Sequence, residues 1–170
     1  QVLVTLKEIT ARRDRAAARE RQLDLFTKAQ EIANVGAWEY DLRTEEFYWS
    51  EQVYAIYGLS PAVELTSERG IEAYHPDDRD EIRDAFTAAV ESGESYDLEL
   101  RLIDDTDDLR WVRTRGEPQF DDDGSVVRVR GTIQDITERK AREETLQQMR
   151  TAVDNAPIGI VVSDPTQPDN

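Results

Sequence analysis

The sequence contains no cysteine, and this absence removes several functional classes at once. Disulfides, thiolate metal sites, cysteine nucleophiles and covalent cysteinyl-flavin photochemistry all require a thiol. A single histidine, His75, leaves few groups for acid–base catalysis near neutral pH. The chain also shows no Gly-rich phosphate loop and no nucleophile elbow. We therefore expect no catalytic residues and no metal site in this segment.

Long apolar runs are missing as well. No stretch approaches the roughly 20 apolar residues that a membrane-spanning helix needs, and the N-terminus has no signal-peptide pattern. We therefore expect a cytoplasmic segment that makes no membrane contact. The hydrophobic share of 38% over 170 residues is enough for one core with extensions on either side.

Positive charge is scarce. Lys and Arg total 21 against 37 Asp and Glu, which gives a net charge of −16, and the only lysines are Lys7, Lys28 and Lys140. Such a surface repels phosphate backbones and anionic lipid, so we expect no nucleic-acid partner. An acidic surface with Arg favoured over Lys is typical of proteins adapted to high salt, where the Debye length falls to about 3 Å at 1 M. An ordinary acidic protein is the alternative interpretation.

An internal repeat indicates how the chain is organised. The stretch at 4–13 (VTLKEITARR) is similar to 131–140 (GTIQDITERK), and Gly36 corresponds to Gly159. Chance similarity is the alternative to a tandem array. The array predicts the following segments: the last strand of a preceding module at 1–10, a linker helix at 11–33, a complete module at 34–137, a linker or signalling helix at 138–155, and the start of a following module at 156–170.

Both predicted linkers read as helices with a narrow apolar stripe. Residues 11–33 lack Gly and Pro and are rich in helix formers, and Leu25 and Ala29 share one face. Leu146 and Met149 follow the spacing of coiled-coil core positions. Thr10 and Thr137 are suitable N-caps for the two helices. We expect these helices to form a homodimer.

The segment between the linkers reads as strands, then helices, then strands. Alternating patterns predict strands near 38–42, 47–50, 96–102, 109–119 and 127–133. Ser50 can cap a helix that ends at Gly58, residues 66–73 suggest a further turn or two, and Asp77 or Asp78 opens an amphipathic helix that Gly93 ends. This order predicts an α+β fold, an antiparallel sheet with helices on one face.

Six short motifs stand in this segment, among them His75-Pro76-Asp77-Asp78-Arg79, Arg110-Trp111-Val112 and Asp135-Ile136-Thr137. Together they resemble the PAS family, in the order and spacing common in bacterial and archaeal sensor kinases. The resemblance implies a five-stranded sheet in the order 2-1-5-4-3, sensing or signal relay, and neighbouring PAS and output domains. It implies a histidine kinase as the parent protein, with a transcriptional regulator or a transducer as alternatives. With the acidic surface, it favours a halophilic archaeon as the source.

One departure from the PAS pattern concerns the turn before Arg110. The resemblance implies Asp-Gly there, whereas this chain has Asp104-Asp105-Thr106-Asp107-Asp108. The segment lacks the Gly and the distal Glu of a calcium loop. We interpret it as a solvated acidic turn.

Aromatic residues of the same segment are candidates for a ligand pocket, although such a set more often fills a core. The candidate pocket residues are Trp38, Tyr40, Trp49, Tyr54, Tyr57, Phe86 and Leu100. No residue demands non-covalent flavin. The resemblance implies a haem-binding His near position 82, where this chain has Ile82. We therefore expect no haem, and a structural role for His75.

The remaining candidates concern transmission and interfaces. We expect a conformational change to pass from the sheet through Asp135, Ile136 and Thr137 into the second helix, which presents Leu146 and Met149 to its dimer mate. Trp111 and Arg113 belong to an outer sheet face that a linker helix or a partner covers, together with Leu25 and Ala29 of the first helix. An ordinary exposed face is the alternative.

Overall fold

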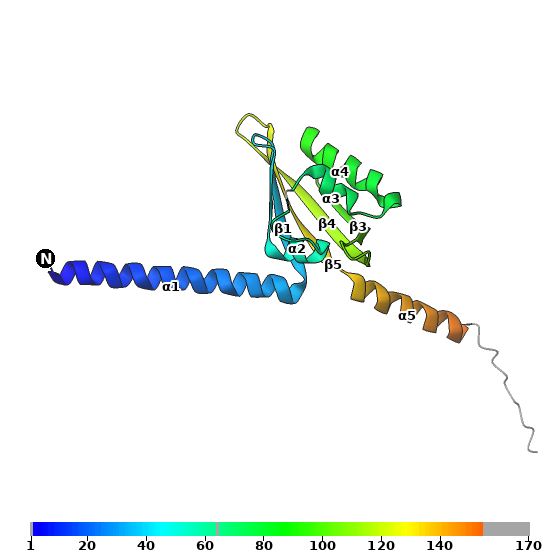
Figure 1. Ribbon diagram of the computed structural model, residues 1–170, viewed down its shortest axis with the longest axis horizontal. Helices are drawn as coiled ribbons and strands as arrows, with labels where there is room; N and C mark the ends of the chain where they lie inside the picture. Colours follow the sequence, from blue (N-terminus) through cyan, green and yellow to red (C-terminus); the bar gives the residue numbers. More distant parts are fainter. Residues whose placement is uncertain (1, 64, 155–170) are drawn as a thin grey trace, which may run out of the picture. The chain divides into compact units, whose positions relative to one another are not determined.

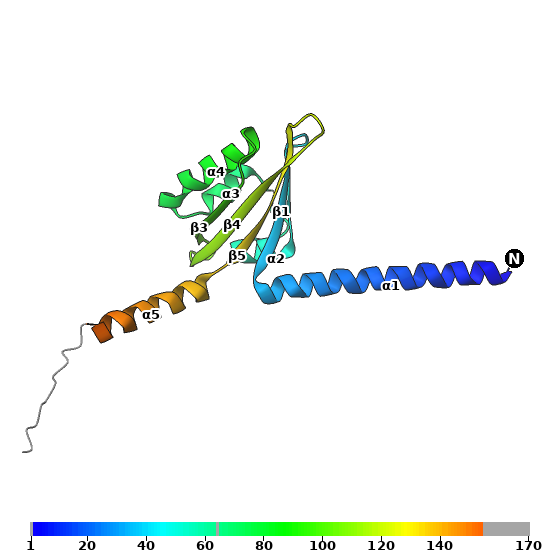
Figure 2. The same cartoon turned by 180° about the vertical axis from the view of Figure 1, so that it is seen from behind.

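A computed structural model describes residues 2–63 and 65–154 of the chain. The elements are α1 (Val2–Ala33), β1 (Val35–Asp41), β2 (Glu46–Trp49), α2 (Glu51–Tyr57), α3 (Ser67–Glu72), a 3-10 turn (Pro76–Asp78), α4 (Arg79–Glu91), β3 (Tyr96–Ile103), β4 (Leu109–Phe120), β5 (Val126–Asp135) and α5 (Thr137–Asp154). The strands form one antiparallel sheet in the order β2-β1-β5-β4-β3. The predicted α+β fold and its strand order are confirmed (Figures 1 and 2).

The three helices between β2 and β3 cover one face of this sheet. Figures 1 and 2 show α3 and α4 on the same side of β3 and β4. Val53 and Ile56 of α2 are buried, as is Ile82 of α4. They pack against sheet residues that alternate along their strands and point to the same side, among them Leu100, Leu102, Val112 and Ile133. Period-two alternation therefore places one face of each strand in the core.

Two glycines in the middle of the sheet make room for large aromatic rings. Gly116 of β4 and Gly131 of β5 are paired opposite each other. A Cβ at Gly116 would overlap the Tyr96 ring, and one at Gly131 would overlap the Arg115 carbonyl and the Trp38 ring. The Trp38 and Tyr96 rings lie nearly parallel, with an angle of 19° and centroids 6.5 Å apart. Because glycine has no side chain, both rings can lie directly on the sheet at these two positions.

The His75–Arg79 motif ties the helical layer to the free edge of β3. The His75 amide donates to the Arg101 carbonyl at 2.8 Å, and the Ile103 amide donates to the Ala73 carbonyl at 2.8 Å. The Asp78 carboxylate accepts from the Arg101 amide at 2.8 Å and from its guanidinium at 2.5 and 3.0 Å. An edge strand with unpaired backbone groups is prone to aggregation. The bonds from His75, Ala73 and Asp78 give backbone groups of β3 at this edge their hydrogen-bond partners.

Several residues predicted as helix caps bind elsewhere. The Ser50 hydroxyl makes no cap bond and instead accepts from the Ala37 amide of β1 at 3.0 Å. Asp78 makes no cap bond to α4, because its carboxylate is taken up by Arg101. His75, by contrast, has the structural role expected, since its Nδ1 accepts from the Asp77 amide at 3.3 Å.

The strand predicted at 1–10 is wrong. α1 runs from Val2 to Ala33, so Thr10 lies inside a helix and does not cap one. A strand satisfies its backbone groups only through a neighbour, whereas a helix satisfies them internally. No strand pairs with this segment in the described sheet, and the helix-forming run that follows extends through it. The predicted linker at 11–33 is helical throughout, and the predicted module start at 156–170 lies outside the described residues.

We predict that Gly131→Ala destabilises the fold by about 3 kcal/mol, because the new methyl group overpacks a fixed backbone position. Gly70→Ala is the matched control. Gly70 lies within α3, and a Cβ there meets only the Trp49 ring at 3.6 Å, so helix propensity should add up to about 1 kcal/mol. Guanidinium unfolding of both variants measures the difference. Equal stability of the two would contradict the assigned packing.

Candidate functional site

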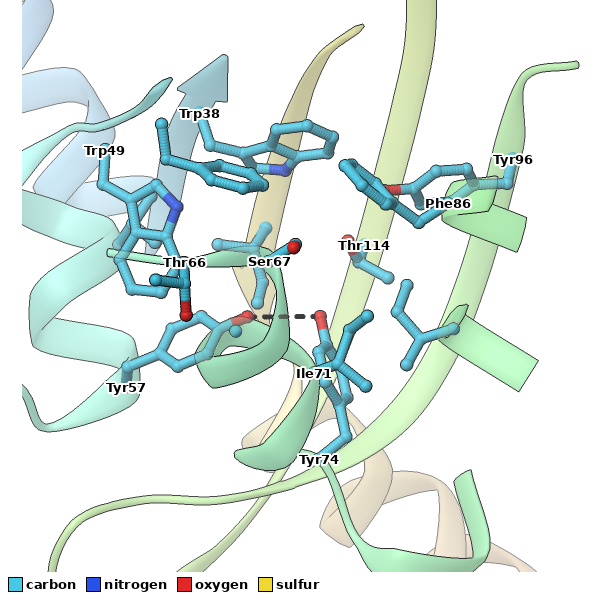
Figure 3. Close-up of a pocket in the computed structure, with 15 residues that line it drawn as sticks. Trp38, Trp49, Tyr57, Thr66, Ser67, Ile71, Tyr74, Phe86, Tyr96 and Thr114 are labelled. Atoms are coloured by element: carbon cyan, nitrogen blue, oxygen red, sulfur yellow. Dashed lines mark hydrogen bonds between the residues drawn. The ribbon is translucent and has the colours of Figure 1, made fainter. Parts of the chain in front are cut away.

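An aromatic cavity of about 50 Å³ lies between the helices and the sheet. Figure 3 shows its residues, which come from both layers. Four of the predicted pocket residues line it: Trp38, Trp49, Tyr57 and Phe86. The described lining residues do not include Tyr40, Tyr54 or Leu100. Tyr40 packs against Phe86 with ring centroids 5.5 Å apart, Tyr54 meets the Trp49 ring at 5.5 Å, and Leu100 belongs to the core.

Hydroxyl groups form a polar part of the cavity wall, for which the sequence predicted Tyr57 but not Tyr74, Tyr96 or Thr114. Those of Tyr57 and Tyr74 face each other at 3.5 Å (Figure 3), and Tyr96 and Thr114 also line the cavity. Burial raises the pKa of all three tyrosines above the usual 10, so they stay protonated near neutrality. None of the described lining residues is charged. The period-two alternation of their strands, which puts Tyr96 and Thr114 on the core face, could have identified these two residues from the sequence.

The single histidine does not belong to the described lining of this cavity. Ile82 does line it, at the position where the resemblance implies a haem ligand, and its side chain is 4% exposed. Among residues 2–63 and 65–154, no three Asp, Glu or His side chains are grouped as metal ligands would be. The cavity as it stands offers ring faces and hydroxyl groups.

A second candidate site is the helix joint, formed by Asn34, Arg110, Trp111, Asp135, Ile136 and Thr137. Asp135 lies at its centre. Its amide donates to the Asn34 carbonyl at 3.1 Å, directly after α1. Its carboxylate accepts from the Thr137 amide at 2.9 Å, where α5 begins, and from the Arg110 guanidinium at 3.3 Å. One residue therefore holds the end of α1, the beginning of α5 and strand β4.

Thr137 does not cap α5 as predicted. Its hydroxyl accepts from the Trp111 amide of β4 at 3.0 Å, and the Ile136 amide donates to the Trp111 carbonyl at 2.8 Å. Ile136 is 5% exposed. The Asp135 carboxylate accepts the hydrogen bond from the first amide of α5, that of Thr137. The Thr137 hydroxyl bonds to β4 instead. The three residues predicted for transmission thus fasten the chain to β4 immediately before α5.

The acidic turn at 104–108 is organised around a buried carboxylate, so its interpretation as solvated is wrong for Asp104, whose side chain is 1% exposed. One oxygen accepts from the Thr106 amide at 2.9 Å, the Thr106 hydroxyl at 2.6 Å and the Asp108 amide at 3.1 Å. The other accepts from Arg110 at 2.9 Å. Asp107 takes the left-handed conformation, with φ 63°, that a glycine would otherwise provide.

The outer face of the sheet carries a ladder of ion pairs. Arg113 and Arg115 share Asp97, with N–O distances of 2.6 and 2.9 Å. Arg128 pairs with Asp41 at 2.9 Å, and Arg130 pairs with Glu39. The Arg113 guanidinium, followed by that of Arg115, lowers the pKa of Asp97. The cross-strand register explains these pairs, because each Arg stands beside an acidic residue of the adjacent strand.

The other predicted interface residues are on the surface. Trp111 is half-buried on the outer face, and Ala29 is exposed. Leu25 is 64% exposed, Leu146 67% and Met149 61%. Large apolar side chains that are this exposed can form a surface that a partner covers.

Comparison with known proteins now settles the family. The family model for the PAS fold matches residues 46–133, which is just over half of the chain. The chain belongs to the PAS fold family. The match begins at β2, includes the three helices that enclose the cavity, and ends within β5 at residue 133.

Several curated relatives of this PAS domain are signalling proteins. It is 32% identical over 150 residues to the two-component sensor PprA of Pseudomonas aeruginosa, and 29% identical over 125 residues to a blue-light-activated histidine kinase of Brucella anthropi. It is 26% identical over 126 residues to the probable diguanylate cyclase DgcE of Escherichia coli. These alignments cover 78%, 74% and 74% of the chain, but only 15%, 25% and 11% of the relatives.

Solved structures show the same fold. A sensory box histidine kinase/response regulator from Burkholderia thailandensis matches with a TM-score of 0.59 at 30% identity, over 76% of this chain and 97% of that one. A domain of a histidine kinase from Haloarcula marismortui matches with a TM-score of 0.54 at 32% identity, over 69% and 99%. The chain is thus a PAS sensor domain of signal transduction.

Along its described residues, no helix has the length and apolar character to cross a membrane.

We predict that Asp104 contributes stability that disappears in acid. Hydrogen bonds from Thr106, then those from Asp108 and Arg110, lower its pKa from 3.8 to about 2. A depressed pKa stabilises the fold above the unfolded value, and this contribution falls as the pH drops from about 4 towards 2. Urea unfolding of the chain and of Asp104→Asn should therefore differ most above pH 4 and converge towards pH 2. A difference that does not change with pH would contradict this.

Proposed function

We propose that this PAS domain relays a conformational change between the segments that flank it. The observation that carries the proposal is the central position of Asp135, which binds the end of α1, the beginning of α5 and Arg110 of β4. A movement of the sheet therefore acts on both helices through one residue. Relay requires an arrangement of helices with two states whose balance the sheet can shift.

The size of the cavity supports relay over capture of a large cofactor. Its volume of about 50 Å³ compares with the roughly 300–1,000 Å³ of sites for drug-sized ligands. A bound flavin or haem would need α3 and the neighbouring rings to move apart. The chain also has no cysteine for a flavin adduct and Ile82 in place of a haem ligand.

A sensor that binds a small molecule directly is the second candidate function. It is favoured by the cavity lining, where ring faces surround the hydroxyls of Tyr57 and Tyr74. The chemistry suits a small uncharged molecule that stacks on a ring and accepts a hydrogen bond. One relative is a blue-light-activated histidine kinase, and we take its activation by a stimulus as support for this second candidate.

For the parent protein we propose a cytoplasmic sensor histidine kinase. Two of the relatives described above are a two-component sensor and a histidine kinase. The diguanylate cyclase among the relatives makes a cyclase an alternative output domain. A transcriptional regulator is a further alternative. The output domain would follow this segment, which would itself have no catalytic role. The tandem array of neighbouring PAS modules is proposed on the sequence similarity of 131–140 to 4–13 alone, because 4–13 is helical and does not form the strand that the array predicted. The acidic surface argues against a nucleic-acid partner.

Dimerisation through the linker helices is part of this proposal. Leu146 and Met149 of α5 are three residues apart on one stripe and largely exposed. In α1, Leu25 and Ala29 form a similar stripe, with Phe26 beside it, 60% exposed. Helices with such seams bury them against an identical helix in coiled coils.

We predict that the purified chain is a colourless dimer. Leu146→Glu combined with Met149→Glu should shift it to monomer, because charges would enter the apolar seam. Gln147→Glu adds the same kind of charge on the same helix and should leave the dimer intact. Native mass spectrometry and absorption above 300 nm measure both properties. A monomeric wild-type chain contradicts the dimer, and a bound chromophore or added mass supports direct ligand sensing instead.

We also propose that the protein works at high salt, as expected for a halophilic archaeon. The net charge of −16 repels itself strongly in dilute buffer, and molar salt screens this repulsion. The melting temperature should therefore rise by several degrees between 0.05 and 2 M KCl. Sodium acetate at equal ionic strength separates screening from specific ion effects. The same melting temperature in all buffers would remove the basis for salt adaptation.

A further inference from the structure

The end of α2 contacts the acidic turn directly. Tyr57 lines the cavity, and its carbonyl accepts from the Asp105 amide at 3.3 Å. Gly58 follows in the left-handed conformation, with φ 69°, and ends the helix. A Cβ at Gly58 would lie 3.3 Å from both the Asp104 Cβ and the Asp105 amide nitrogen. The backbone after the cavity wall therefore packs directly on the turn.

Within the turn, Asp104 uses its two oxygens for different purposes. Oδ1 collects three donors from Thr106 and Asp108, which fixes the conformation of the turn. Oδ2 accepts from Nε and lies 2.9 Å from Nη2 of Arg110. A charge-assisted pair is stronger than a neutral hydrogen bond, and losing Arg110 would leave the buried Asp104 carboxylate without its charged partner. The position of the turn and the position of Arg110 are therefore linked.

Arg110 is shared between two carboxylates that belong to different parts of the fold. It binds Asp104 in the turn and Asp135 in the helix joint, where the N–O distance is 3.3 Å. Its side chain is 34% exposed, whereas those of Asp104 and Asp135 are 1% and 13% exposed. The short bonds go to Asp104 and the longer one to Asp135. A displacement of the turn therefore changes the contact that Arg110 makes with the residue holding α5.

We propose that Asp104 is a positioning residue that couples the cavity wall to the start of α5 by holding Arg110 against Asp135. The route runs from Tyr57 through the acidic turn to Arg110, and from there through Asp135 to the Thr137 amide. The proposal rests on the relay function above and adds its route within the domain. Asp104 does not have to touch a ligand or α5 to act.

A double-mutant cycle on the 170-residue chain tests this route. Tyr57→Leu alters the cavity wall, where the Tyr57 ring lies 4.5 Å from that of Trp49, and Tyr57→Phe is a gentler change if the first variant does not fold. Each is combined with Asp104→Asn, which keeps acceptors for the turn and removes the charge that holds Arg110. Asp105→Asn, one residue along the same turn, is the control. The readout is amide hydrogen exchange over the first two turns of α5, with β5 as internal reference.

We expect the Tyr57 change to speed exchange at the start of α5 about threefold or more relative to β5, which reports local opening. This effect should disappear in the Asp104→Asn background and persist in the Asp105→Asn background. An equal effect in the Asp104→Asn background overturns the proposed route and leaves the relay function standing. No effect of the Tyr57 change in the otherwise unaltered chain overturns the relay function itself, and the route with it.

Discussion

The structure depends on how a single strand end, at Asp135, is held. The amide of Asp135 bonds to Asn34 and its carboxylate to Thr137 and Arg110, so the helix that enters the sheet and the helix that leaves it share one anchor. Because both helices are joined to the end of the central strand β5, the relay proposed above would pass small movements of the sheet to both of them.

The interior of the domain is built so that it can influence this anchor. The glycine pair Gly116 and Gly131 lets the rings of Trp38 and Tyr96 lie on the central strands, beneath the helical layer. Any change in the packing of these rings acts on β4 and β5 themselves. The cavity and the helix joint therefore share this pair of strands, because Thr114 and Ile133 line the cavity close to Trp111 and Asp135 of the joint. Relay and direct sensing differ in where the change begins.

The fold could be predicted from the sequence because its evidence is local and repeated, as in the clean alternation of 96–102 and the order of the PAS blocks. Features that depend on partners distant in sequence could not. Asp104 lies among acidic residues that suggest a solvated turn, and its burial follows from the approach of Gly58 and Arg110. The β-branched residues before Thr10 suggest a strand, but a strand needs a neighbour and a helix does not.

The location of the ion pairs bears on function at high salt. Pairs on the outer sheet face, such as Asp97 with Arg113, are 38–43% exposed and would lose much of their attraction when the Debye length falls to about 3 Å. Asp104 is shielded from solvent, and its bonds to Arg110 and Thr106 are short. Salt screens buried pairs far less than exposed ones. The Arg110 side chain is 34% exposed, so a route through Asp104 and Arg110 would lose some attraction in brine, but less than the Asp97–Arg113 pair, in which both side chains are exposed.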